Sequence, residues 1–362
     1  MKYLVQIVRV FVGILFILSG FVKLVDPKGT SYKLYDYFAE DVLNIIFLQD
    51  YVLPLAFIFV VAEVVLGVFL LLGVFKKMTL GSLLGLIVFF TFLTFYSAYF
   101  DKVKDCGCFG DALKLDPWES FYKDLVLLVA ILILLAGQQY IRPLFPYKLN
   151  LILASIATFL SVLVAYIGIA RLPIIDFRPY AVGEDLKENI KDIEKPVIQI
   201  NYTLKNTQTG DSKIVDSETY INDEWWKNKD WKLQSDLTTE EVIEEGIPAR
   251  IHDFVIRDDE FTNEILTQNN VFLIINYDRF TLDEEIEITS FIRNLEKEKE
   301  LYYVLSSEKM KGFEDAYSLD GVVLKTIVRS SPGVILLDQG IVKAKWHWKD
   351  LPDSEELKSF KQ

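Results

Sequence analysis

Long apolar runs separated by short polar loops make up the first 171 residues. A helix that crosses a bilayer needs about 20 mostly apolar residues, because each residue rises about 1.5 Å along the axis. Five runs reach this length, and they are Tyr3–Val25, Tyr51–Phe75, Met78–Phe100, Phe121–Ile141 and Leu149–Ala170. We therefore expect an α-helical transmembrane bundle, with four core helices within residues 1–145 and a fifth helix within residues 146–171.

The first run has a second interpretation, a cleaved signal peptide. It is long for that purpose, and no small-x-small cleavage site follows it cleanly. We therefore expect the first run to remain in the protein as a transmembrane helix.

The short loops predict an orientation, because Lys and Arg collect on the cytoplasmic side. The loops at 76–77 and 142–148 hold Lys or Arg and no acid, whereas residues 26–50 and 101–120 hold five Lys and ten acids. We expect a multi-pass protein of the inner (cytoplasmic) membrane with its N-terminus in the cytoplasm. Five crossings then place everything from residue 172 onward outside, in the periplasm.

In the second half of the chain, apolar segments are shorter and alternate with polar ones, as in a soluble α/β domain. Residues 196–220 alternate apolar and polar positions around a Gly-Asp turn, which predicts a hairpin. Residues 251–266 suggest a second, edge hairpin. The continuously apolar run 271–278 is typical of a strand buried on both faces. A helix over 283–300 and a strand over 301–307 are expected to follow it.

The last segment predicts a short helix, then Pro332, then two antiparallel strands about a Gln-Gly turn. The order strand–helix–strand–helix–proline–strand–strand over about 245–350 resembles thioredoxin. This resemblance implies that Pro332 is the cis-proline of that fold. It also places the active cysteine pair of a thioredoxin at 279–282, where this chain has no cysteine.

The predicted organisation outside the membrane therefore has two parts. Residues 172–244 form a linker and hairpin region, and residues 245–362 form a thioredoxin-like domain without active-site cysteines. Such a domain either binds a partner peptide along the Pro332 edge or serves packing alone.

Charge divides the chain where hydropathy does. Residues 1–171 carry 14 Lys and Arg against 12 acids, and residues 172–362 carry 24 against 39, for net charges of +2 and −15. Nucleic acid is excluded as a partner, because phosphates need a basic surface. The expected partners are membrane lipid and a periplasmic protein client.

Cys106 and Cys108 are the only cysteines, and both lie in the motif DCGCFGD of the third loop. Thiols outside the cytoplasm are oxidised or handled by dedicated machinery. Two cysteines around one glycine can close a small, strained ring, and strained disulfides are easily reduced. We take this pair as the candidate catalytic site. A static disulfide, two inert thiols and a metal site are the alternatives, although two sulfurs without a nearby His make a poor zinc shell.

Four charged residues of the membrane half are candidates for binding or for tuning the cysteines. Glu63 falls near the middle of the second run, so it is expected to face the bundle and to be paired or protonated. Lys23, Lys123 and Asp124 lie at the depth of the cysteine loop, where a nearby Lys favours the reactive thiolate. The alternative for the lysines is that they extend to the membrane interface. Pairing of Lys23 with Glu63 is left open.

These motifs together resemble a known family. SGFVKLVDP, Glu63 with Gly67, DCGCFGD, and Trp118 at a charged helix start resemble the DoxX-like membrane proteins, and among them the MauE (methylamine utilisation) branch, over about residues 1–145.

The resemblance implies a four-helix membrane bundle distantly similar to vitamin K epoxide reductase. MauE members are thought to help form disulfides while a periplasmic enzyme matures, and DoxX relatives are associated with quinone-linked oxidation of sulfur compounds. Carried over, the resemblance points to Cys106 and Cys108 as the site, and it makes a quinone a candidate cofactor without supplying the reaction. The fifth apolar run departs from the family pattern.

Two functions from different classes follow. In the first, the bundle is a component of extracytoplasmic thiol/disulfide or quinone-linked redox chemistry, and the soluble domain presents a client. In the second, the chain is a non-catalytic membrane-anchored assembly factor or scaffold that needs no cysteine. Transport is supported by Glu63 alone, and no repeated or broken hydrophobic halves accompany it.

Overall fold

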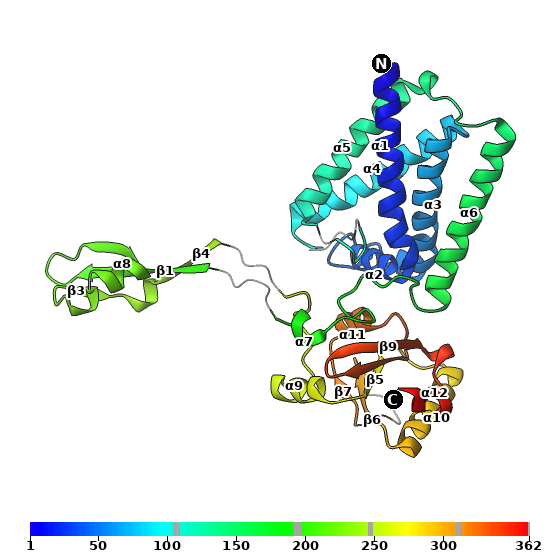
Figure 1. Cartoon of the computed structure of the whole chain (residues 1–362). Helices are drawn as coiled ribbons and strands as arrows, with labels where there is room; N and C mark the ends of the chain where they lie inside the picture. Colours follow the sequence, from blue (N-terminus) through cyan, green and yellow to red (C-terminus); the bar gives the residue numbers. More distant parts are fainter. Residues whose placement is uncertain are drawn as a thin grey trace. The chain divides into compact units, whose positions relative to one another are not determined.

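The computed structural model falls into two units, Met1–Gly183 with Val255–Gln362, and Glu184–Phe254 (Figure 1). Cys106 and Cys108 lie outside the residues that the structure describes. The described residues are 1–103, 107, 109–113, 115–191, 197–244, 249–308, 313 and 315–360.

Among the described residues of the first unit, four helices are long and apolar enough to span a membrane. They include every predicted run but one, with ends within three residues of the prediction. They are α1 (Lys2–Val25), α3 (Val52–Leu72, preceded by the 3₁₀ turn η1, Ile46–Tyr51), α4 (Lys76–Phe100) and α6 (Tyr147–Ala170).

The remaining run, Phe121–Ile141, is found as helix α5 (Pro117–Ala136). Its first two turns carry Glu119, Lys123 and Asp124, so it is less apolar than the other four. A bundle of four apolar helices is therefore established. That α5 also crosses the membrane, which the predicted orientation requires, stays a prediction.

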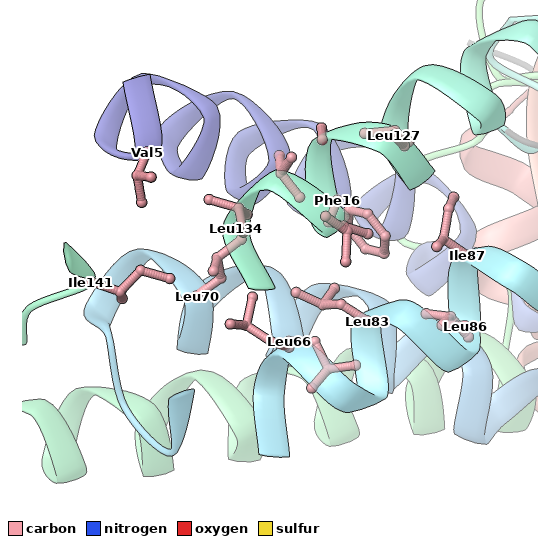
Figure 2. Close-up of a cluster of buried hydrophobic side chains, with 14 residues drawn as sticks. Val5, Phe16, Leu66, Leu70, Leu83, Leu86, Ile87, Leu127, Leu134 and Ile141 are labelled. Carbon is pink, nitrogen blue, oxygen red and sulfur yellow. The ribbon is translucent and has the colours of Figure 1, made fainter. Parts of the chain in front are cut away.

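An apolar core joins α1, α3, α4 and α5. Val5 and Phe16 of α1 meet Leu70 of α3 and Leu83 of α4, and Leu134 of α5 closes the cluster (Figure 2). None of the buried side chains of this core is polar. The candidate site uses a separate set of buried polar residues of the bundle, among them Lys23, Glu63 and Asp124.

A short helix that the hydrophobic pattern does not predict, α2 (Pro27–Phe38), follows α1. Asp26 caps it by accepting a hydrogen bond from the Gly29 amide at 3.0 Å. Pro27 occupies its first position, where the missing N–H costs nothing. The dipeptide Asp26–Pro27 is thus the sequence signal for this helix.

The C-terminal part of the first unit is built on a mixed five-stranded sheet of order β7-β6-β5-β8-β9. All six residues of the central strand β5 (Val271–Asn276) are buried, as the continuous apolar run predicts. β5 pairs in parallel with β6 and antiparallel with β8. The other strands are β6 (Leu301–Ser306), β7 (Tyr317–Ser318), β8 (Gly333–Asp338) and β9 (Ile341–His347).

The structure has the predicted order of elements in this part except for β7, a two-residue strand between β6 and α11 that was not predicted. Helix α10 (Leu282–Glu298) connects β5 to β6, and α11 (Gly321–Ile327) precedes β8. The Ser331–Pro332 bond before β8 is cis, as expected at that position. A short helix, α12 (Ser354–Ser359), follows β9.

The predicted edge hairpin over 251–266 is wrong, because helix α9 (Asp259–Thr267) occupies its second half. Asp258 caps this helix by accepting a hydrogen bond from the Phe261 amide at 2.8 Å. Phe261, Ile265 and Leu266 are buried at helical spacing. Apolar and polar residues alternate before Asp258 but not after it. The N-terminal cap at Asp258 therefore marks where a helix begins in place of the predicted second strand.

The second unit contains the predicted hairpin of β1 (Val197–Asn206) and β2 (Ser212–Asp216), which pair antiparallel. Strands β3 (Trp231–Leu233) and β4 (Thr239–Glu244) also pair antiparallel with β1. Short helices α7 (Leu186–Asn189) and α8 (Ser217–Asn222) complete this unit.

Candidate functional site

A buried ion pair joins α1 to α3. Lys23 Nζ lies 2.5 Å from Glu63 Oε2 and donates a hydrogen bond to Oε1 at 2.7 Å. The Ser19 hydroxyl donates to Glu63 Oε1 at 2.8 Å. Both charged side chains are at least nine-tenths buried, with 7% and 5% exposure. Glu63, near the middle of α3, is thus paired inside the bundle, and the pairing that the sequence leaves open is present.

A glycine makes this pair geometrically accessible. A Cβ atom added to Gly20 would lie 2.8 Å from Val64 Cγ2 and 3.1 Å from Glu63 Cβ. The backbone of α1 therefore approaches α3 closely where the ion pair forms, as small residues permit in membrane helix packing. This proximity lets Lys23, near the end of α1, reach the carboxylate of Glu63.

A second polar cluster lies between α4 and α5. Lys123 Nζ is 3.0 Å from Asp124 Oδ1, and the Thr94 hydroxyl donates to Asp124 Oδ2 at 3.2 Å. Lys123 Nζ also lies 5.1 Å from the centre of the ring of Phe109, which belongs to the motif DCGCFGD. Asp124 is 2% exposed, so this acid, like Glu63, is held inside the bundle.

One cavity of about 60 Å³ brings these two clusters together. Its wall includes Gly107, the residue between Cys106 and Cys108. Gly107 has a φ of +64°, and a Cβ added to it would lie 3.2 Å from Lys33 Cγ of α2. The polar residues of the wall are Ser19, Lys23, Thr30, Lys33, Tyr37, Glu63, Thr94, Lys123 and Asp124.

Four of the five residues predicted to bind or tune therefore line one cavity. Pro332, the fifth, is not among its described lining residues. Pro332 is buried in the C-terminal part, beside the turn after β5. There the Ser331 hydroxyl accepts hydrogen bonds from the Tyr277 and Asp278 amides at 2.9 and 3.0 Å.

Sequence reasoning missed the lining residues that α2 supplies, Thr30, Lys33 and Tyr37. Lys33 and Tyr37 lie one helical turn apart, so they reach the same side of α2. The Asp26–Pro27 helix start is the signal that could have found them. Chemically, the cavity offers ammonium groups that favour a thiolate and carboxylates that can accept protons, within largely apolar walls.

Comparison with known families supports the nature of the membrane region. Residues 1–137 match the model of a family described as methylamine utilisation protein MauE. No curated protein and no solved structure matches the chain. The match covers the region from α1 to α5, which is similar to this family, and α6 and the C-terminal part lie beyond the match.

Proposed function

We propose that this MauE-type membrane protein performs thiol–disulfide or quinone-linked redox chemistry on the outer side of the inner membrane, through Cys106 and Cys108. One observation carries the proposal. Lys23, Glu63 and Asp124 line the same buried cavity as Gly107, the residue between the two cysteines.

The proposed step is a two-electron oxidation. A bond forms between the two sulfur atoms of Cys106 and Cys108, and two protons and two electrons leave. Either a client disulfide accepts them and becomes two thiols, or a quinone accepts them and becomes a quinol. Ammonium groups of the cavity favour the thiolate that starts the reaction, and its carboxylates take up the protons in passing and transfer them to the acceptor.

The lining of the cavity has the chemistry of a quinone site, and at about 60 Å³ the cavity must widen to admit the ring. Phe16, Phe59 and Phe90 provide apolar walls, and Lys23 provides a donor beside them. A quinone bound there would supply a two-electron acceptor soluble in the membrane. In this proposal, five crossings including α5 put the cysteine loop and the C-terminal part outside.

The C-terminal part is proposed to be a cysteine-free thioredoxin-like domain. Three observations support this assignment. They are the order of the strands in the sheet, the parallel pairing of β5 with β6 through the connecting helix α10, and the cis Ser331–Pro332 bond. The turn after β5, at 277–281, holds no cysteine. Without active-site cysteines, the role of the domain is to bind a partner, which is either a periplasmic client or the membrane region of the same chain.

That cysteine-free turn also favours the second candidate function, a non-catalytic assembly factor. The two functions differ in what they require. Thiol chemistry needs Cys106 and Cys108, whereas a scaffold needs residues 172–362. A chain cut after residue 171 should keep thiol oxidation under the first function and lose all activity under the second.

Thiol trapping tests the proposal. In intact cells, a membrane-impermeant maleimide should label reduced Cys106 and Cys108 from outside. In detergent, the reduced full-length chain mixed with a short-chain quinone should lose both thiols and form quinol, and Cys106→Ser should form none. Labelling that needs access from the cytoplasm, or quinol formation and client oxidation that Cys106→Ser leaves unchanged, would overturn it.

A further inference from the structure

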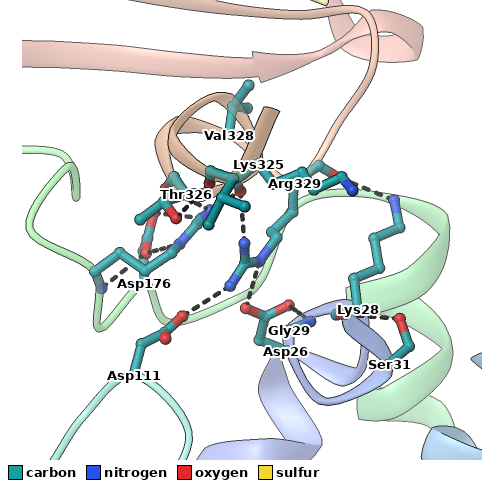
Figure 3. A network of polar contacts seen from close by, with 12 residues as sticks. Asp26, Lys28, Gly29, Ser31, Asp111, Asp176, Lys325, Thr326, Val328 and Arg329 are labelled. Atoms are coloured by element: carbon teal, nitrogen blue, oxygen red, sulfur yellow. Dashed lines mark hydrogen bonds and ion pairs between the residues drawn. The ribbon is translucent and has the colours of Figure 1, made fainter. Parts of the chain in front are cut away.

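A single arginine of the C-terminal domain binds two acids of the membrane region. Arg329 Nε lies 2.7 Å from Asp26 Oδ2, and its Nη2 lies 2.7 Å from Asp111 Oδ2 (Figure 3). Its third nitrogen, Nη1, donates to the Lys325 carbonyl at 2.5 Å. The Arg329 side chain is 5% exposed, so all its polar contacts are made within the protein.

The two acids belong to different segments of the membrane region. Asp26 ends α1 and caps α2. Asp111 lies in the turn Phe109–Leu113, which begins directly after Cys108. In that turn the Gly110 amide donates to the Gly107 carbonyl at 3.0 Å, and the Ala112 amide donates to the Phe109 carbonyl at 3.2 Å. Arg329 therefore connects the cysteine loop to the start of α2.

The charges of this contact depend on one another. Burial opposes charge on both sides, but Asp26 and Asp111 together raise the pKa of Arg329 above its ordinary value. In return, Arg329 and Arg178 hold the pKa of Asp26 below its usual range despite burial. Removing the guanidinium would leave two carboxylates without their cation, which is costly inside a protein.

Neighbouring contacts come from the same edge of the domain. Lys28 Nζ of α2 donates to the Arg329 carbonyl at 2.9 Å. Tyr32 of α2 lies under two cations, with Lys325 Nζ 4.9 Å and Arg329 Cζ 5.3 Å from its ring centre. Arg329 comes just before Ser331 and Pro332. The edge beside the cis-proline, for which peptide binding and plain packing are the two predicted roles, thus contacts α2 of its own chain.

We propose that Arg329 is a positioning residue, which holds the turn Phe109–Leu113 against the start of α2 and thereby lets the C-terminal domain set the reactivity of the cysteine pair. The structural part of this proposal concerns Asp26, Asp111 and Arg329 alone. Its chemical consequence rests on the function proposed above for Cys106 and Cys108.

The experiment compares three full-length variants in detergent: Arg329→Gln, Asp111→Asn and Arg257→Gln. Arg257 is the matched control, since it is an arginine of the same domain that pairs with Asp258 and is 57% exposed. Asp111→Asn keeps the Arg329–Asp26 pair, so it tests the loop contact even if Arg329→Gln fails to fold.

Two measurements are made on each variant. Hydrogen exchange reports the Gly110 and Ala112 amides, and alkylation with a neutral maleimide reports the reduced cysteines. Both rates should rise about fivefold or more in Arg329→Gln and Asp111→Asn, a typical size for coupling between sites. Combining the two substitutions should add little, because they remove one interaction. Arg257→Gln should match the unaltered chain.

Unchanged exchange in Asp111→Asn would overturn the contact between the domain and the loop. Faster exchange with unchanged alkylation would overturn the effect on the cysteines. Neither measurement uses an electron acceptor or a client. The positioning role therefore stands or falls separately from the proposed redox function, which the Cys106→Ser experiment tests.

Discussion

At the scale of single residues, the ion pair between Lys23 and Glu63 shows that a charge buried in a helical bundle depends on its partner. Each charge alone would be costly among apolar helices. Together, at 2.5 Å and with Ser19 as a further donor, they compensate much of that cost. A buried pair rarely adds stability over an apolar pair, but losing one partner is strongly destabilising.

Glu63→Gln should therefore destabilise the protein, because it leaves the Lys23 ammonium buried without its counter-charge. We expect a loss of about 3–5 kcal/mol in the free energy of unfolding, measured by denaturant titration in mixed micelles. Lys23→Met combined with Glu63→Met should recover much of this loss.

A control comes from the exposed pair of Lys191 and Glu188, whose side chains are 66% and 69% exposed. Glu188→Gln should leave the unfolding midpoint unchanged, because solvent screens such pairs. If Glu63→Gln had the same free energy of unfolding as Glu188→Gln, the buried pair would make no contribution to stability.

The sequence could identify those site residues whose side chains differ strongly in polarity from the residues around them. Glu63 and Asp124 stand out because carboxylates are rare within apolar runs, and both line the cavity. Ser19 and Thr94 line it too, but hydroxyls are common in membrane helices and carry no such contrast. For Lys33 the sequence carries only the helix start at Asp26–Pro27, because its approach to Gly107 depends on the path of α2 in the folded protein.

Among the elements, α1 and α3 pack through facing glycines. A Cβ added to Gly67 of α3 would lie 2.9 Å from Ile17 Cγ1 and 3.0 Å from the Gly13 carbonyl oxygen. At Gly85 of α4, by contrast, nothing lies within 4 Å. Small residues at such a crossing allow close backbone contact, which stabilises helix pairs where the hydrophobic effect is absent.

The pair of substitutions Gly67→Ala and Gly85→Ala tests this packing. Gly67→Ala should cost about 1–3 kcal/mol, the usual range for overpacking. Gly85→Ala should be neutral or stabilising by up to about 1 kcal/mol, because Ala favours helix over Gly. Thermal unfolding in detergent would measure both, and equal shifts for the two variants would argue against a close α1–α3 contact.

Elements with strong periodicity were predictable and short capped ones were not. The lengths of the apolar runs gave α1, α3, α4 and α6, and the buried run gave β5. Helices α2 and α9 depend instead on caps by Asp26 and Asp258, each set by one or two side-chain contacts. Hydrophobic periodicity is judged over about ten residues, so it does not detect a helix start that depends on one capping side chain.

At the scale of the whole molecule, buried charges tie the segment after α6 to the C-terminal sheet. Asp176 lies 2.7 Å from both Arg178 Nε and Lys345 Nζ. Burial opposes its charge, but Arg178 and Lys345 lower the pKa of Asp176 to about 2. The stabilisation from this carboxylate is therefore complete above its ordinary pKa of 3.8 and is lost only as the pH falls toward 2.

His347, at the end of β9, should make the protein sensitive to acid at a higher pH. Burial, together with Lys28, Lys349 and Arg171, lowers the pKa of His347 from 6.5 to about 4. Its Nδ1 accepts a hydrogen bond from the Lys349 amide at 3.2 Å, which protonation would break. The unfolded chain thus binds this proton more readily than the folded chain between these two values.

The free energy of unfolding should therefore fall as the pH decreases from about 6.5 to about 4. His347→Gln should flatten this dependence in thermal unfolding of the full-length chain. His252, the only other histidine, is exposed, so His252→Gln should keep the slope of the unaltered protein. A His347→Gln variant with that same slope would place the acid sensitivity elsewhere.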